Sequence, residues 1–200
     1  FLTFLVPGLV MMTVLQNAFA NTSSSLVVSN VQGNIVDILM PPLAAGELLA
    51  GLAAGGMTRG IAVGIVAAIV LGAFGDIGLP AAPFAAICFL VLGSLALSFA
   101  GILAGVWANK FDEMAAITNF VIQPLAFLSG TFYSVDRLPP PFDLVATLNP
   151  VFYAIDGFRF GLIGVADRPV VTGLLVLVLV NLVLGALCYR VLASGFRLKS

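Results

Sequence analysis

Five apolar stretches, each long enough to cross a lipid bilayer, restrict what this 200-residue chain can fold into. A helix needs about 20 apolar residues to cross the ~30 Å hydrocarbon core. The five stretches are Phe1–Ala20, Leu48–Phe74, Ala81–Trp107, Met114–Tyr133 and Pro169–Tyr189. Each is predicted to be an α-helix, because unpaired backbone groups are costly in hydrocarbon. The sequence therefore predicts an all-α integral membrane protein with one transmembrane domain over residues 1–200.

The composition supports this class and excludes several others. Hydrophobic residues make up 61% of the chain and charged residues 8%, and the mean hydropathy is +1.18, values typical of a membrane protein. With a net charge of −1 and two lysines, the chain offers no basic surface for a nucleic acid. Histidine is absent, which excludes histidine-dependent metal sites and Ser–His or Cys–His catalysis. Cys88 and Cys188 lie within apolar stretches and are predicted to be free thiols.

No enzyme active site is predicted. Neither lysine follows a glycine, so the chain lacks the G-x-x-x-x-G-K-[ST] loop that binds nucleotide phosphates. Asp112 and Glu113 are adjacent and would project about 100° apart on a helix, which makes them a poor acid–base pair. The chain is therefore predicted to have no catalytic residue, no metal site and no cofactor of its own.

A charged segment, Gly130–Arg168, lies between the fourth and fifth apolar stretches and holds seven charged residues. A lipid-facing span over Leu144–Val165 is unfavourable there. Asp156 and Arg159 would each cost about 2.5–3.5 kcal/mol at the middle of such a helix, and each apolar residue returns only about 0.3–0.6 kcal/mol. An ordinary span is therefore not predicted in this segment.

Prolines indicate a different structure for the same segment. Three consecutive prolines, beginning at Pro139, stop the preceding helix, and Asn149–Pro150 is typical of a turn or a helix start. The sequence predicts a re-entrant pair of short helices over residues 135–165, hinged near Pro150, that enters and leaves on one side of the membrane.

The spacing of Asp156 and Arg159 leaves two interpretations open. The residues are three apart, so on a helix they share a face and can neutralise each other. If buried, the pair would fix the re-entrant helix or line a substrate path. If exposed on an interfacial helix, it would contribute little. A structural role is favoured over direct contact with a substrate.

A short amphipathic helix is predicted over residues 30–40. Ser29 and Gln32 have the spacing of a capping box, apolar residues then recur at helical intervals, and Pro41–Pro42 ends the helix. Such a helix on the membrane surface either docks a soluble partner or simply connects two spans.

Polar and small residues form stripes on three of the predicted spans. The polar stripes consist of Thr13, Asn17, Asn21 and Ser24 along the first span and Asn119 and Gln123 in the fourth. They are predicted to face away from lipid, either along an export path or in interhelical hydrogen bonds. The small-residue stripe consists of Gly56, Gly60 and Gly64 in the second span. It suits close helix packing within one subunit or between two.

With these motifs, the sequence resembles permease subunits of the ABC-2 type transporter family, which exports polysaccharides, lipid-linked sugars, nodulation factors and drugs. The specific pattern is L-N-P-x-x-Y-x-x-D-G-x-R, formed by Leu148, Asn149, Pro150, Tyr153, Asp156, Gly157 and Arg159. It follows the run F-L-S-G-T-F-Y at residues 127–133 and Leu138–Pro139. Pro7–Gly8, Gly33, Pro42 and Gly51 support the resemblance, which covers essentially the whole chain.

The resemblance implies six spans per subunit, a homodimer or heterodimer of permeases, and two soluble ATPase subunits that bind ATP and magnesium. On that pattern the chain lacks an N-terminal amphipathic helix and the first span, in agreement with its odd number of apolar stretches. The implied location is the bacterial inner membrane. The implied substrate is a glycan, a lipid-linked molecule or a drug-like compound.

Three groups of residues receive roles from the resemblance. The helix over residues 30–40 would be the coupling helix that docks on the ATPase, with Gln32, Gly33, Asn34 and Asp37. The extracytoplasmic re-entrant, gating segment would include Asn149, Pro150, Tyr153, Asp156, Gly157 and Arg159. Possible pathway or helix-contact residues are Asn17, Asn21, Asn119 and Gln123. Many family members carry charges just ahead of the coupling-helix glycine, whereas Asn30 and Gln32 are neutral and leave Asp37 as the one available charge.

Orientation and mechanism remain to be decided between alternatives. The face with Lys110, Arg190, Arg197 and Lys199 is predicted to be cytoplasmic, and Arg59 is expected to snorkel toward it. The favoured function is the membrane subunit of an ATP-driven exporter. The alternatives are an ion-coupled secondary transporter that uses Asp156 and Arg159, and a membrane scaffold without transport activity.

Overall fold

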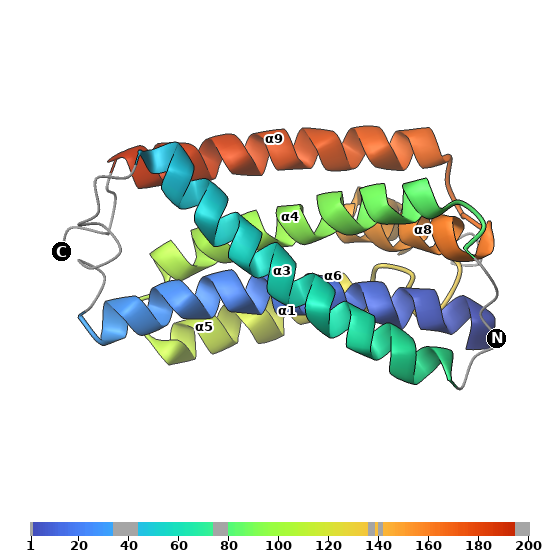
Figure 1. Ribbon diagram of the computed structural model, residues 1–200, viewed down its shortest axis with the longest axis horizontal. Coiled ribbons are helices and arrows are strands. Elements are labelled where there is room, and N and C mark those ends of the chain that lie inside the picture. Colours follow the sequence, from blue (N-terminus) through green and yellow to red (C-terminus); the bar gives the residue numbers. More distant parts are fainter. Residues whose placement is uncertain (1, 34–43, 74–79, 136–138, 140–141, 195–200) are drawn as a thin grey trace.

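The computed structural model describes residues 2–33, 44–73, 80–135, 139 and 142–194, which form helices and no strand (Figure 1). Four helices are long and apolar enough to cross a membrane. They are α1 (Leu2–Val31), α3 (Ala45–Gly72), α4 (Pro83–Trp107) and α9 (Val170–Ser194). The predicted all-helical membrane architecture is confirmed, with four candidate spans among the described helices.

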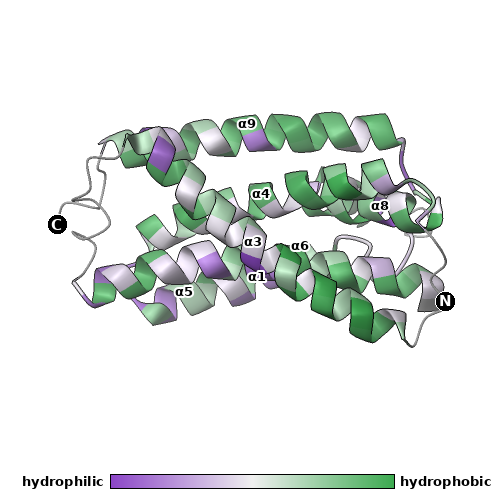
Figure 2. Cartoon of the chain, in the orientation of Figure 1, coloured by the Kyte–Doolittle hydropathy of each residue, from purple (hydrophilic) through white to green (hydrophobic). Residues whose placement is uncertain are grey.

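Helix α1 lies at the centre of the molecule and packs against α3, α4 and α8 (Pro150–Ile163). Helix α3 crosses α1 obliquely, and α9 runs along the opposite edge beside α4 (Figure 1). Figure 2 shows hydrophobic residues along most of α9 and the C-terminal half of α3, with hydrophilic residues where α1 and α3 cross. The apolar outer surfaces of α3 and α9 are suited to lipid.

Helix α1 continues well beyond its predicted end at Ala20, without a break, to Val31. The polar residues after Ala20 do not end the helix, because their hydroxyl groups bond back to carbonyls of the preceding turn. Thr22 also donates to the Ser98 carbonyl of α4 at 3.0 Å, and Ser23 donates to the Phe19 carbonyl at 2.8 Å. Such bonds satisfy small polar side chains inside a buried helix.

The capping box predicted for Ser29 and Gln32 is wrong. Ser29 lies in the last turns of α1, where its hydroxyl donates to the Ser25 carbonyl, and the N–H of Gln32 donates to the Val28 carbonyl. Gly33 then adopts a positive φ of 73°, as is common just after a helix end. The remainder of the predicted short helix, including Asn34 and Asp37, lies outside the described residues.

Glycines let three helices approach closely. Their positions decide whether the small-residue stripe of Gly56, Gly60 and Gly64 packs within one subunit or between two. Gly56, Gly60 and Gly64 of α3 face α1 within the same subunit. A Cβ atom at Gly60 would lie 2.7 Å from the Val14 carbonyl oxygen. Gly101 and Gly105 of α4 make equally close approaches to α1. The packing is therefore internal and depends on small residues, as expected for helices in lipid.

The fourth predicted span is shorter than expected. It is a continuous helical stretch formed by α5 (Phe111–Ile117), the π-helix η1 (Thr118–Ile122) and α6 (Gln123–Phe127). It ends before the predicted limit at Tyr133, because a turn follows in which Gly130 has a φ of 70°. Pro124 accounts for the π-helix, since its ring would clash with the carbonyl four residues earlier in a regular α-helix.

Helix α8 spans only half of the bundle. Its first turns lie beside the middle of α4, where a Cβ atom at Gly93 would be 3.0 Å from that of Ala154. Its last turn meets the start of α4, where the Ala82 N–H donates to the Gly161 carbonyl at 2.9 Å. A separate short helix, α7 (Phe142–Leu148), precedes it, with Asn149 between the two. The predicted helix start at Asn149–Pro150 is confirmed.

Replacing Gly60 with alanine should destabilise the protein by about 1–3 kcal/mol, because the added methyl group would press on the α1 backbone. Gly51→Ala on the same helix is the matched control, since nothing lies within 4 Å of its Cβ position. That variant should be neutral or slightly stabilising. Thermal melting in detergent measures both, and equal melting temperatures for the two variants would contradict the packing described.

Candidate functional site

The most polar buried region lies around α8, at the end of the bundle where α1, α4 and α9 begin, at Leu2, Pro83 and Val170. Both members of the predicted pair are buried there: Asp156 is 3% exposed and Arg159 is fully buried. The alternative of a surface pair on an interfacial helix is therefore wrong.

Arg159 makes its shortest contact with a backbone carbonyl. Its Nη2 donates to the Gly130 oxygen at 2.6 Å, while its Nη1 lies 3.8 Å from the Asp156 carboxylate. The guanidinium also stacks over the Phe4 ring of α1, 3.8 Å from the ring centroid. Arginine suits this position because its planar cation can bond in its plane and stack on its face.

Asp156 acts on the chain beyond its own helix. Its two carboxylate oxygens accept hydrogen bonds from the backbone N–H groups of Asp167, at 2.9 Å, and Arg168, at 3.1 Å. These residues belong to the connection between α8 and α9. Because hydrogen bonds to a charged acceptor are stronger than neutral ones, the carboxylate holds this connection against α8.

Asp167 continues the same network and was not singled out from the sequence. Its carboxylate accepts hydrogen bonds from the Ser134 hydroxyl at 2.9 Å and from the Val135 N–H at 2.8 Å. Its position just before the predicted fifth span, which begins at Pro169, is that of an ordinary loop residue. No sequence signal indicates that it instead binds a segment more than 30 residues earlier.

Asn149 joins α8 to the end of α6. Its side-chain oxygen accepts a hydrogen bond from the Val151 N–H at 3.0 Å, which caps α8, and its amide nitrogen donates to the Leu125 carbonyl at 2.6 Å. Pro150 occupies the first turn of α8, where a missing N–H costs nothing. The Asn-Pro pair thus starts α8 and fixes its depth relative to α6.

Two glycines allow the helices around this network to come together. Gly157 of α8 faces the Phe89 ring of α4 so closely that a Cβ atom there would overlap the ring. Gly8 of α1 lies beside the loop, where a Cβ atom would be 2.8 Å from the Thr131 carbonyl oxygen. Tyr153 packs edge-on against Phe152, at 5.1 Å between ring centroids.

The arrangement is a buried brace formed by Asn149, Asp156, Arg159 and Asp167, which we call the α8 brace. It ties together the loop after α6, helix α8 and the connection to α9. Nearly all of its polar atoms bond to backbone groups; the Nε of Arg159 has no hydrogen-bond partner among the described residues. Within the described part of the chain, no three histidine, cysteine, aspartate or glutamate residues come together as a metal site.

The other predicted site residues lie apart from the brace. Asn17, Asn21 and Gln123 are half-buried and Asn119 is exposed, on the faces of α1, α6 and η1 in the middle of the molecule. Gln123 accepts a hydrogen bond from the Gln16 side chain at 3.2 Å. Gln32 and Gly33 are exposed beyond the C-terminal end of α1, at the opposite end from the brace.

A bundle of long apolar helices with a braced half-length helix defines a multi-pass membrane protein, and comparison with known proteins identifies its family. The ABC-2 type transporter family profile matches residues 1–163. The inner membrane transport permease YadH of Escherichia coli (strain K12) is 38% identical over 200 residues, which is 100% of this chain and 78% of that protein.

Nodulation protein J sequences are also similar. That of Rhizobium leguminosarum bv. viciae is 30% identical over 131 residues, covering 64% of this chain and 49% of that protein. That of Bradyrhizobium diazoefficiens is 27% identical over 164 residues, covering 80% and 61%. The chain belongs to the ABC-2 type transporter family. It is a membrane permease subunit of an ABC exporter, located in the bacterial inner membrane and associated with an ABC ATPase.

Replacing Asp156 with asparagine should lower stability by about 1–3 kcal/mol, because an amide offers one acceptor oxygen where two N–H groups need one each. Asp112→Asn is the control, since Asp112 is exposed at the far end of the molecule. Melting temperatures in detergent measure the difference. A variant at Asp156 that melts with the control would contradict the bracing role.

Proposed function

We propose that this permease works as a dimer with two ATPase subunits, and that ATP hydrolysis on those subunits drives export of a glycan, a lipid-linked molecule or a drug-like compound. ATP and magnesium would be bound by the partner subunits. Closure of the ATPases would press on the segment after α1 and open the interface between the two permeases. The substrate would then pass between the permeases toward the outside.

The engagement of the α8 brace carboxylates with nearby N–H and hydroxyl groups is the observation that favours ATP over an ion gradient. A secondary transporter would need an ionisable group in the membrane that can bind and release an ion or a proton. The candidates are Asp156, which is buried, and Asp167, which is half-buried, and each already accepts two hydrogen bonds. Among the described residues of the four candidate spans, the one carboxylate is Glu47, near an end of α3.

The proposed topology has five spans in this chain and a re-entrant pair. In addition to the four candidate spans, the helical stretch from α5 through α6 would cross the membrane, completed by the loop that follows. It would be the fourth span in chain order. The re-entrant pair would be α7 and α8, which turn at Asn149 beside the middle of α4. The gating residues would be those of the motif, because displacing α8 would disturb Asn149, Asp156 and Arg159 together.

The coupling role is proposed for the segment that begins with Gln32 and Gly33. Both residues are exposed, at the same end of the molecule as the start of α3 and of α5 (Figure 1). Lys110 and Arg190 are exposed at that end as well, which supports a cytoplasmic location there. Asn34 and Asp37 would supply the remaining contacts to the ATPase.

Reversing the charge of Asp37 with Asp37→Lys should leave the permease in the membrane but lower substrate-stimulated ATP hydrolysis several-fold, because the coupling contact is weakened. Asp112→Lys makes the same charge change at an exposed position of α5 and should have a much smaller effect. Transport that continues unchanged after deletion of residues 34–40 would overturn the proposed coupling role.

The energy source can be tested separately in inverted membrane vesicles. Export should stop when ATP is removed and should persist when a protonophore collapses the proton gradient. The opposite result would favour an ion-coupled transporter, and a permease that co-purifies with no ATPase and moves no substrate would favour a scaffold.

A further inference from the structure

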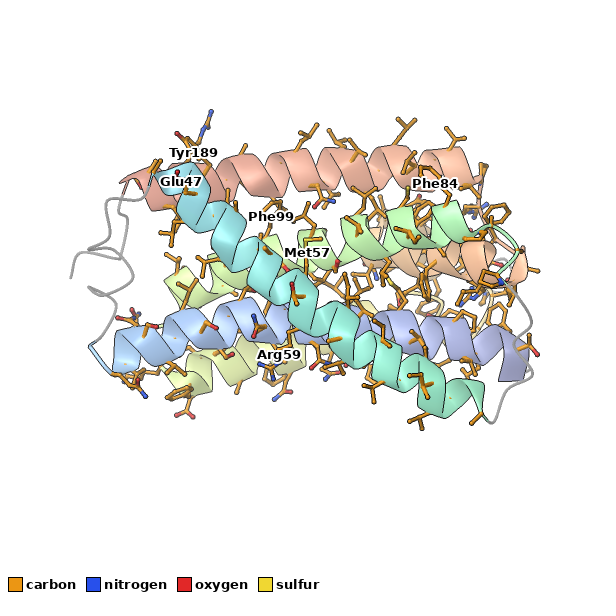
Figure 3. All side chains as sticks on the ribbon, in the orientation of Figure 1. Glu47, Met57, Arg59, Phe84, Phe99 and Tyr189 are labelled. Carbon is orange, nitrogen blue, oxygen red and sulfur yellow. The ribbon has the colours of Figure 1, made fainter. Side chains whose placement is uncertain are left out.

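Arg59 is an exposed cation in the middle of a candidate span. Helix α3 runs from Ala45 to Gly72, so Arg59 lies halfway along it, and Figure 3 shows it where α3 crosses α1. It was expected to snorkel to the cytoplasmic end, but its Nη1 donates to the side-chain oxygen of Asn21 at 3.2 Å. Ten more residues of α1, about 15 Å of helix, separate Asn21 from that end.

No described carboxylate neutralises this cation. The one acidic residue in the four candidate spans is Glu47, twelve residues away on the same helix, or about 18 Å along its axis. The two carboxylates of the α8 brace, Asp156 and Asp167, bond to N–H and hydroxyl groups around α8. A guanidinium at this depth is costly unless it meets a counter-charge or water, so a face that carries it is unsuited to lipid.

The partner of Arg59 on α1 belongs to a group of polar side chains in the middle of the molecule. Asn17 and Asn21 lie along the same face of α1, and Gln16 bonds to Gln123 of α6. By contrast, the C-terminal half of α3 exposes apolar side chains, with Ile65, Val66, Ile69 and Val70 more than half exposed. The change from polar to apolar surface along one helix indicates that only the central part of this face is shielded from lipid.

The chemistry of the pair suits an oxyanion. The guanidinium has five N–H donors and uses one on Asn21, which leaves a planar edge that matches a phosphate or carboxylate. The amide nitrogen of Asn21 adds a donor next to it. One turn before Arg59 lies the exposed Gly55, whose missing side chain leaves space beside that amide, with 3.7 Å from its Cβ position to the amide nitrogen.

We propose that Arg59 and Asn21 form an anion-binding site halfway across the membrane, which binds the phosphate or carboxylate group of the exported substrate. This inference rests on the proposed function, because the pair recognises cargo only if the α1–α3 face lines the export path. It narrows the substrate class to amphiphilic or glycan molecules that carry a negative charge.

Binding can be measured directly with radiolabelled dodecyl phosphate, using the permease with its ATPase subunits in phosphatidylcholine nanodiscs. Dodecanol serves as the neutral probe of the same length. Wild type should bind dodecyl phosphate at least about tenfold more tightly than dodecanol, and Arg59→Gln should remove that preference. Competition by inorganic phosphate separates recognition of a free anion from recognition that needs a lipid chain, and either outcome supports the site.

Two further variants keep the test decisive if Arg59→Gln fails to fold. Asn21→Asp places a carboxylate against the guanidinium, so it should preserve or raise the melting temperature and still abolish the preference for dodecyl phosphate. Arg190→Gln, at an exposed position near the end of α9, is the matched control and should bind like wild type. An equal preference for dodecyl phosphate in wild type and Asn21→Asp would overturn the proposal.

The same preparation distinguishes failure of this inference from failure of the proposed function. If the complex hydrolyses ATP and exports substrate but wild type binds dodecyl phosphate no better than dodecanol, the anion site is wrong and the exporter stands. If dodecyl phosphate binds through Arg59 but ATP removal does not stop export, the site stands and the energy source is wrong.

Discussion

The hydrogen bond from the buried guanidinium of Arg159 to the Gly130 carbonyl is the interaction on which the α8 end of this permease depends. A charge that is fully enclosed by protein can be kept only if its surroundings supply polar partners. Here those partners are a carbonyl from the loop after α6, the ring of Phe4 on α1 and the carboxylate of Asp156. The cation therefore requires three parts of the chain to come together, and Asp156 and Asp167 extend that requirement to the start of α9.

This network explains why a segment rich in charge can lie inside a membrane protein. The charged groups face backbone N–H and C=O groups that the irregular loops would otherwise leave unpaired. The side chains and the loop backbone therefore supply each other's hydrogen-bond partners. Asp156 and Arg159 lie 3.8 Å apart, farther from each other than from the backbone groups that they bind. Both residues act mainly as ligands for backbone at positions 130, 167 and 168.

Much of this architecture could be predicted from residues in sequence order, because lipid permits few backbone structures and the apolar lengths indicate the spans. The start of α8 at Asn149–Pro150 follows from local capping chemistry, which adjacent residues determine. The extent of α1 was missed because bonds such as that from Thr22 to the Ser98 carbonyl keep polar residues helical, and such partners are distant in sequence. Asp167 was missed for the same reason, since its ligands lie more than 30 residues earlier.

Backbone amide exchange in nanodiscs, resolved by NMR, tests most directly whether the charged segment is an internal brace. Asp167 and Arg168 lie in a connection without helical hydrogen bonds, yet a brace requires their N–H groups to be held by Asp156. Exchange at these two amides should be at least about 100-fold slower than at the exposed Val165 in the same connection. Equal exchange at the three positions would contradict the brace and would return Asp156 and Arg159 to the candidates for substrate contact.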